Sequence, residues 1–423
     1  MRNRSVKVLL ENFFALSTLQ ITSYVFPLIT FPYLTLHLGI EGFGTYVFIQ
    51  AVYTYLEVII SYGFKVTATE SVAKHNRNKI KLSKIFYSVI FIKSALLVLI
   101  IFVFLFLYIF IPYVSANIFL FLMGIPYLLG KILFPIWFYQ GIQKMKFITI
   151  IQTITKLFFT GSIFFFVNDS NDVFAALLLH STGVFLAGLF AFLLAINKFK
   201  ISLPIIHISE IIREIHSGFY VFIAQFSVSM YTTINTLLLG AFTNPMTVGV
   251  YALAEKVFKI ITSLGTPVSR SLFPFLAENF NRHFSKYKRY VFLGLIILIS
   301  TFSVLAGFTY TFSGDIISLI ISGNIEELQS VECLKILSFG IPFYPLGAFF
   351  TYLLVIQNEK KSLLKIVSAI VLINTMLAAP AIYYFGVSGL SVVTVIISIC
   401  VAVTKGIYSY KSMVRFENDT VLT

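Results

Sequence analysis

The sequence predicts an all-α polytopic membrane protein with about twelve transmembrane helices, arranged as two six-helix bundles that form a parallel internal repeat. Hydrophobic residues make up 58% of the 423 residues and charged residues only 11%, and the mean hydropathy is +0.93. No globular surface hides so much apolar side chain, which excludes a soluble domain. The apolar stretches and the charges of the loops between them predict the individual helices.

Each predicted helix is an apolar stretch long enough to cross about 30 Å of hydrocarbon, which takes about 20 helical residues. The first stretch is too long for a cleaved signal sequence and is interrupted by Pro27 and Pro32. Only Gly386 and the small residues after it separate the last two stretches. In chain order, the expected helices run from Asn12 to His37, Gly44 to Phe64, Ile85 to Ile111, Asn117 to Gln140, Phe147 to Val167, Val173 to Ile196, Ser217 to Phe242, Thr247 to Pro267, Tyr290 to Phe312, Val331 to Gln357, Ser362 to Phe385 and Gly386 to Tyr410.

The basic residues of the loops fall on one side of this predicted topology. Lys and Arg occur at both ends of the chain and after the even-numbered helices. This asymmetry is the positive-inside pattern and predicts that both termini are cytoplasmic. It also accounts for the net charge of +14, so we expect no nucleic acid partner. Alternate loops contain neither Lys nor Arg: Leu38–Glu41, Pro112–Ala116, Asn168–Asp172, Thr243–Met246 and Ser313–Ser330.

Two similar series of short motifs lie about 200 residues apart, and chance similarity is the alternative to a repeat. Six helices in each half give both halves the same orientation, as in secondary transporters whose site lies between parallel repeats. We expect an N-terminal bundle at 1–198, a cytoplasmic linker at 199–216 that suits a short amphipathic helix, and a C-terminal bundle at 217–423. The matching motifs are Leu38-Gly39, Gly44-Thr45-Tyr46 and Tyr62-Gly63, and then Leu239-Gly240, Gly249-Val250-Tyr251 and Leu264-Gly265.

Lysines deep inside predicted helices indicate what the protein handles. Lys156 and Lys256 each lie about ten residues inside a helix, near the bilayer midplane. A charge at that depth costs roughly 2.5–3.5 kcal/mol on insertion scales, so we expect both to face a cavity that takes an anion. Lys259, Lys131 and Lys93 are further candidates for substrate binding. Lys93 and Lys131 are also close enough to a helix end to reach the membrane surface instead.

Two glutamates accompany these lysines. Glu255 and Lys259 have the spacing and order of a favourable helical ion pair, which would leave Lys256 as the free base. Glu57 occupies nearly the place in the first half that Lys259 occupies in the second. Glu57 and Glu255 are therefore candidate sites for a coupling ion, and for Glu57 the alternative is an ion pair with a neighbouring lysine.

Prolines inside the predicted helices are candidate hinges, because proline removes a backbone hydrogen bond and bends a membrane helix. Pro27 and Pro32 lie in the first helix and Pro342 and Pro345 in the tenth. Static bends are the alternative. The six histidines show no metal-ligand spacing and no nucleophile constellation is visible, so we expect no metal, no catalytic residue and no cofactor.

Several segments resemble the signature of bacterial O-antigen and capsular polysaccharide flippases, a polysaccharide transporter family of the multidrug/oligosaccharidyl-lipid/polysaccharide exporter superfamily. The similar segments span most of the first 280 residues, in the family's order and spacing. They are Leu19-Gln20, Pro27-Leu28-Ile29-Thr30, Pro32-Tyr33-Leu34, Gly42-Phe43-Gly44, Tyr62-Gly63-Phe64, Pro135-Ile136-Trp137-Phe138-Tyr139-Gln140-Gly141, Tyr231-Thr232-Thr233-Ile234-Asn235-Thr236 and Ala254-Glu255-Lys256.

The resemblance implies two six-helix bundles around a central cavity. It further implies flipping of an undecaprenyl-diphosphate-linked oligosaccharide across the bacterial inner membrane, by alternating access, for O-antigen or related polysaccharide biosynthesis. The expected partners are this lipid-linked oligosaccharide, the lipid bilayer and other polysaccharide assembly proteins. The membrane potential favours outward movement of an anion by about 2.3 kcal/mol per charge per 100 mV, and a proton or sodium gradient acting through Glu57 is the competing source of energy.

Two other functions remain open. A cation-coupled exporter of small amphiphilic molecules would share the fold, but acids would be expected to outnumber bases in its cavity. A membrane polysaccharide polymerase is less favoured, because such enzymes use a long polar outer loop. Here the longest outer loop, Ser313–Ser330, is short and contains no His or Arg. We therefore expect a transporter and not an enzyme.

Overall fold

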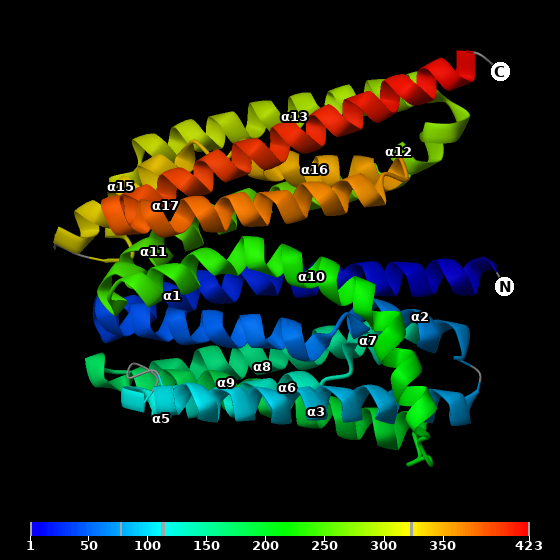
Figure 1. Ribbon diagram of the computed structural model, residues 1–423, viewed down its shortest axis with the longest axis horizontal. Coiled ribbons are helices and arrows are strands. Elements are labelled where there is room, and N and C mark those ends of the chain that lie inside the picture. Colours follow the sequence, from blue (N-terminus) through cyan, green and yellow to red (C-terminus); the bar gives the residue numbers. More distant parts are fainter. Residues whose placement is uncertain (1, 77, 111–114, 322–324, 422–423) are drawn as a thin grey trace. The chain divides into compact units, whose positions relative to one another are not determined.

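The computed structural model describes residues 2–76, 78–110, 115–321 and 325–421, and contains no strand within these ranges (Figure 1). Most of the predicted outer loop Pro112–Ala116 lies outside them. The chain divides into two compact units, Met1–Ser229 and Met230–Thr423. The division falls inside helix α10, so the predicted linker at 199–216 belongs to the first unit.

The first unit contains the helices that correspond to the six predicted crossings of the N-terminal half. Figure 1 shows α1, α3, α6, α8 and α9 running alongside one another in this unit. The elements are α1 (Arg2–Ser61), α2 (Phe64–Lys74), α3 (Lys79–Phe110), α5 (Ile118–Leu122), α6 (Ile125–Leu133), α7 (Ile136–Gly141), α8 (Met145–Phe166), the 3₁₀ turn η1 (Ser170–Asp172), α9 (Val173–Phe199) and α10 (Ile208–Phe242).

The second unit begins within α10 and repeats much of this order. Its loop at Ser313–Ser330 is largely helical in the described residues. The elements are α11 (Pro245–Ser263), α12 (Gly265–Arg282), α13 (Phe284–Thr311), α14 (Ser313–Ser318), α15 (Ile325–Ser338), α16 (Phe343–Ile356) and α17 (Lys360–Val421).

Two very long helices turn back on themselves at a glycine. α1 departs from helical geometry at Gly39 (φ 70°, ψ 173°), and α17 departs at Gly386 (φ 57°, ψ −136°). A residue with a Cβ rarely adopts such positive φ values, so glycine is what permits each reversal. Figure 1 shows the two parts of each helix running back along each other. The predicted breaks between the first and second spans and between the last two spans are thus confirmed.

The chain is a multi-pass membrane protein. Within the described residues, seven helices are long and apolar enough to cross a membrane, or eight if the bent pair Leu328–Ser338 and Phe343–Ile356 is one span. Two of the seven, Ser17–Lys74 and Lys361–Asn418, have 58 residues each, more than twice the roughly 20 that one crossing needs. Each contains two of the predicted crossings. α10, with 35 residues, and α11, with 19, cover the predicted seventh and eighth crossings but are not among these candidate spans.

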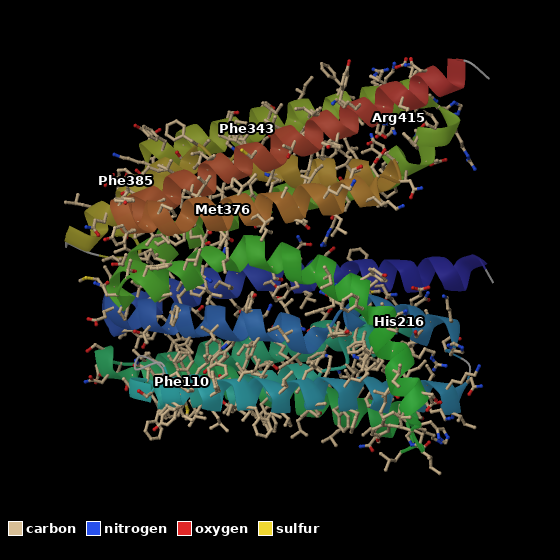
Figure 2. All side chains as sticks on the ribbon, viewed as in Figure 1. Phe110, His216, Phe343, Met376, Phe385 and Arg415 are labelled. Atoms are coloured by element: carbon tan, nitrogen blue, oxygen red, sulfur yellow. The ribbon has the colours of Figure 1, made fainter. Side chains whose placement is uncertain are left out.

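Side chains on the outer faces agree with this assignment. Phe110 on α3 and Met376 and Phe385 on α17 are labelled in Figure 2, and all three are largely exposed. Such residues would face water in a soluble protein at a large cost, but they face hydrocarbon in a bilayer. The fold class predicted from the sequence is confirmed.

The predicted fourth and tenth crossings are broken helices. α5, α6 and α7 replace a single helix over Asn117–Gln140, because Pro126 begins α6 and Pro135 precedes α7. In the tenth crossing, α15 and α16 are bent by 41° at a break that includes Pro342, with Pro345 just inside α16. Pro27 and Pro32 lie within helical backbone of α1. Whether any of these prolines acts as a hinge stays a prediction.

The order of elements supports the internal repeat. In each unit a short helix follows the second crossing after a glycine: α2 after Gly63 and α12 at Gly265. α2 packs against α7, which ends the fourth crossing, and α12 packs against α16, which ends the tenth. Close approach explains two of the glycines, because a Cβ on Gly141 would lie 2.5 Å from Val72, and one on Gly265 would lie 2.5 Å from Pro345.

The segment between α9 and α10 begins where Lys200 adopts left-handed geometry and ends α9. α10 starts at Ile208, inside the predicted linker, and continues into the predicted seventh crossing. Lys84 of α3 pairs with Glu210 of α10 at 2.9 Å. The Lys84 ammonium holds the pKa of the Glu210 carboxyl below its usual value. This ion pair attaches the start of α10 to the rest of the first unit.

Candidate functional site

The first unit encloses a cavity of about 440 Å³. The residues that line it come mainly from α1, α2, α3, α6, α7, α8 and α9, so crossings far apart in the sequence build one site. Its charged lining residues are four lysines and one glutamate: Lys65, Lys93, Lys131, Lys156 and Glu57. Lys65 is exposed at the start of α2, and the other four lie deeper in the crossings.

An ion pair between α1 and α6 forms the centre of this cluster. Lys131 Nζ lies 3.0 Å from Glu57 Oε2, and both side chains are less than one-third exposed. The Tyr127 hydroxyl donates to the same glutamate oxygen at 2.6 Å. The Lys131 ammonium also lies 5.0 Å from the centre of the Tyr127 ring, within range of a cation–π interaction. The alternatives for Glu57 were a coupling-ion site and an ion pair with a neighbouring lysine, and the structure shows the ion pair.

Two further lysines lie in the cavity without a carboxylate partner among the described residues. Lys93 of α3 is 5% exposed, and its ammonium donates to the backbone carbonyl of Lys131 at 3.3 Å. Lys156 of α8 donates to Ser23 Oγ of α1 at 2.7 Å. The structure therefore brings Lys93, Lys131 and Lys156 to one cavity, as the sequence predicted for Lys156 and left open for Lys93 and Lys131.

The predicted charges of the second unit lie on α11. Lys259 pairs with Glu255 at 2.9 Å, and Glu255 is buried. The predicted pairing of these two residues is confirmed. Lys256 is not without partners in the structure, so its description as a free base is wrong.

Several lining residues were not predicted from the sequence. Tyr127 precedes Lys131 by four residues and thus lies on the same helix face, a spacing that would have indicated it. Gln50 and Gln152 are polar residues within apolar crossings, which is also a signal. His180 carries no such signal, yet its ring stacks on Tyr127 at 5.6 Å. In the second unit, Lys405 was missed too; it is 8% exposed and donates to Thr351 Oγ1 at 2.9 Å.

The motif residues that carry the family resemblance have mostly structural contacts. Trp137, Phe138 and Tyr139 of α7 are almost fully buried in the core of the first unit, and Tyr139 donates to the carbonyl of Ala191 at 2.6 Å. In the second unit, Asn235 accepts a hydrogen bond from Asn374 at 2.8 Å. Trp137 also lines the cavity, where its indole N–H has no hydrogen-bond partner among the described residues.

Comparison with sequence families identifies the chain. The family described as "Polysaccharide biosynthesis protein" matches residues 9–280, more than half of the sequence. The chain belongs to this family. The family described as "MatE" matches residues 221–379. The resemblance that the sequence motifs indicated is therefore confirmed.

Two relatives of this polysaccharide biosynthesis family member carry the name "Putative O-antigen transporter". The one from Escherichia coli (strain K12) is 31% identical over 264 residues, which are 62% of this chain and 64% of that protein. The one from Shigella dysenteriae is 27% identical over 388 residues, which are 90% of this chain and 94% of that protein. The match to the first relative thus spans less than two-thirds of its length.

Solved structures show the fold of this family member. The lipid II flippase MurJ in an inward closed conformation matches with a TM-score of 0.74 and 13% identity, over 98% of this chain and 91% of that one. An inward-facing multidrug resistance MATE transporter of the MOP superfamily matches with a TM-score of 0.63 and 13% identity, over 93% of this chain and 99% of that one. The predicted exporter-superfamily fold is confirmed by these likenesses.

Proposed function

We propose that this protein is a transporter that flips an undecaprenyl-diphosphate-linked oligosaccharide from the cytoplasmic to the periplasmic leaflet of the bacterial inner membrane. The flipped unit would serve the synthesis of O-antigen or a related polysaccharide. The observation that carries the proposal is the cavity of the first unit, where Lys93, Lys131 and Lys156 meet one carboxylate, Glu57. The names of the two relatives agree with it.

The charge of this cavity favours an anionic substrate. A lysine within a membrane crossing costs several kcal/mol unless it meets water or an opposite charge. Lys131 has Glu57, whereas Lys93 and Lys156 have a carbonyl and a hydroxyl as their hydrogen-bond acceptors. A diphosphate would supply the missing negative charge. Lysine suits this role because its compact ammonium binds phosphate as a point charge, without a fixed two-point geometry that would hinder release.

The polar and aromatic lining suits the sugar that follows the diphosphate. Gln50 and Gln152 supply amide groups, and the buried indole N–H of Trp137 is a further donor. The volume of about 440 Å³ lies within the usual range for small-molecule sites, about 300–1,000 Å³. The lipid tail needs no enclosed site, since it can remain in the surrounding hydrocarbon.

Transport by alternating access would involve the second unit as well. We assign Lys256 and Lys259 of α11 to substrate binding on the same grounds of depth and charge, and keep the bends near Pro342 and Pro345 as candidate hinges. The outward movement of the anion would be driven by the membrane potential, with a proton or sodium gradient acting through Glu57 or Glu255 as the competing mechanism. Both termini would lie in the cytoplasm, where the polysaccharide assembly proteins can meet them.

One observation favours a second candidate function. The MatE family matches much of the second unit, so we retain a cation-coupled exporter of small amphiphilic molecules as the alternative function. The charge of the cavity opposes that alternative, because an amphiphilic cation would meet three lysines and one glutamate in its deeper part. An enzyme such as a polymerase fits less well, since the family's relatives are named as transporters.

Reconstitution tests the proposal directly. Vesicles containing the purified protein and a polyprenyl-diphosphate-linked oligosaccharide would be probed with a lectin that cannot cross the membrane. We expect protein-dependent loss of the outer-leaflet sugar, and a rate that falls when the membrane potential is collapsed with ion gradients held. Absence of flipping, together with uptake of an amphiphilic cation by the same vesicles, would establish the alternative. A rate that survives collapse of the potential would reject potential as the driving force.

A further inference from the structure

The charges of the deeper cavity have a definite balance. Lys93, Lys131 and Lys156 contribute three positive charges, and Glu57 contributes one negative charge, which leaves an excess of two. Lys65 is exposed at the rim, where water screens its charge. In a site of low dielectric constant, each ligand charge that is left unbalanced carries a large free-energy cost. The cavity therefore favours a ligand with two negative charges over ligands with one or three.

Three kinds of polyprenyl phosphate differ in this charge. A diphosphate that links a lipid to a sugar is a diester, with one strongly acidic hydroxyl on each phosphorus and hence two negative charges. A bare polyprenyl diphosphate has an additional ionisable hydroxyl on its terminal phosphate, whose pKa is about 6, so it approaches three charges near neutral pH. A lipid-linked sugar monophosphate has one. Only the sugar-linked diphosphate balances the cavity.

We propose that Glu57 is a specificity-determining residue: by neutralising Lys131 it sets the excess charge of the cavity at two, so that the transporter selects the sugar-linked diphosphate and rejects the bare polyprenyl diphosphate. This inference rests on the proposed function. The distinction matters for a transporter of this kind, because the bare carrier lipid shares the tail and the diphosphate with the substrate and differs in lacking the sugar.

The surroundings of Glu57 hold it in position for this role. The hydroxyl of Tyr127 and the ammonium of Lys131 both bind its Oε2 atom, at 2.6 and 3.0 Å. The Tyr127 ring itself stacks with His180 and with Tyr53, at centroid distances of 5.6 and 6.1 Å. Glu57 is thus a fixed negative charge beside the lysines. A third negative charge on the ligand would lie near it and be repelled.

Tyr53 is in turn fixed from two sides. Its hydroxyl donates to the backbone carbonyls of Leu120 and Phe121, at 2.8 and 2.5 Å. Its ring lies against Gly124, where a Cβ would come within 1.6 Å of the ring carbon that bears the hydroxyl. Because residue 124 has no side chain, the broken fourth crossing can pack against the Tyr53 ring. Tyr53 in turn packs against Tyr127, whose hydroxyl binds Glu57.

The test compares two soluble probes at about pH 7.5, where the terminal phosphate of the bare diphosphate is largely ionised. The probes are farnesyl diphosphate and its diester with N-acetylglucosamine, and calorimetry on the purified full-length protein gives the Kd of each. We expect the wild-type protein to bind the diester more tightly. In Glu57→Gln the ratio of the two Kd values should shift towards the bare diphosphate by about tenfold or more, because Lys131 becomes available for the third charge.

Two further variants separate charge from local structure. The double variant Glu57→Gln with Lys131→Gln restores an excess of two charges, so its Kd ratio should return to within about threefold of the wild type. Lys131→Gln alone lowers the excess charge and should weaken both probes, the bare diphosphate more strongly. Glu70→Gln is the matched control, since Glu70 pairs with Lys74 on the exposed surface of α2 and should leave the ratio unchanged.

The outcomes distinguish this inference from the proposed function. An unchanged Kd ratio in Glu57→Gln, in protein that still binds the diester, would overturn the inference and leave the proposed function intact. So would a double variant that keeps the ratio of the single variant, because the effect would then come from Glu57 itself and not from the charge balance. Failure of the wild-type protein to bind either probe would instead reject the proposed function.

Discussion

Replacing Lys156 by methionine tests the cationic cavity most directly. Lys156 and Lys93 are the two deeper cavity lysines that lack a carboxylate partner in the described part of the chain, and Lys156 donates a hydrogen bond to Ser23. Methionine keeps a similar length and volume and removes the charge. The loss of one partner of a buried charge pair costs about 2–5 kcal/mol. Because Lys156 is only partly buried, the lower part of that range applies, about 2–3 kcal/mol.

This magnitude corresponds to a roughly 30- to 160-fold rise in the Kd for the farnesyl-diphosphate diester. The unfolding free energy should change little, because losing the hydrogen bond to Ser23 is offset by no longer holding a charge in the crossing. Calorimetry gives the Kd, and flipping in vesicles should slow in parallel. Lys146→Met is the matched control: it makes the same substitution on α8, at an exposed position outside the cavity. A change in Kd of less than about threefold for Lys156→Met would refute the reasoning.

Three other substitutions address different parts of the molecule. Lys256→Ala should abolish surface polysaccharide without lowering protein abundance on immunoblots, and wild-type polysaccharide would reject the role assigned to this lysine. Gly124→Ala places a Cβ within 1.6 Å of a tyrosine ring and should lower the unfolding free energy by about 1–3 kcal/mol, measured by thermal melts. Gly161→Ala is the control, because no atom lies within 4 Å of its new Cβ. Equal losses in the two variants would contradict the packing around Gly124. Glu210→Gln should lower the unfolding free energy by up to about 1 kcal/mol near neutral pH. The ion pair with Lys84 lowers the pKa of the Glu210 carboxyl, so it stabilises the fold at pH values above the usual pKa of a glutamate. That difference should vanish as the pH falls through the lowered pKa, and a difference that persists in acid would exclude the ion pair as its cause.

The sequence was sufficient to predict where the chain crosses the membrane. The hydrocarbon core imposes a length of about 20 apolar residues on any crossing helix, and this constraint is local. It predicted the two reversals at Gly39 and Gly386, where the backbone leaves helical geometry and a second helical segment begins. Apolar length alone did not predict that the fourth crossing consists of three short helices; Pro126 and Pro135 are the sequence signal for these breaks.

The candidate site was only partly predictable, because partners come from different helices. Depth in a crossing identified Lys156, and spacing along one helix identified the Glu255–Lys259 pair. The pairing of Glu57 with Lys131 joins residues 74 positions apart, which the spacing within one helix cannot reveal. Lys256 was described as a free base only from its position beside the Glu255–Lys259 pair, whereas the structure gives it interactions.

In both units the lysines within the crossings outnumber the carboxylates that pair with them in the described residues. In the first unit, Glu57 pairs with Lys131, and the deeper part of the cavity also contains Lys93 and Lys156. In the second, Glu255 is paired with Lys259, and the buried ammonium of Lys405 is bound by the Thr351 hydroxyl. Because burying a lysine without an opposite charge costs stability, this excess of lysines agrees with the proposal that a ligand supplies negative charge.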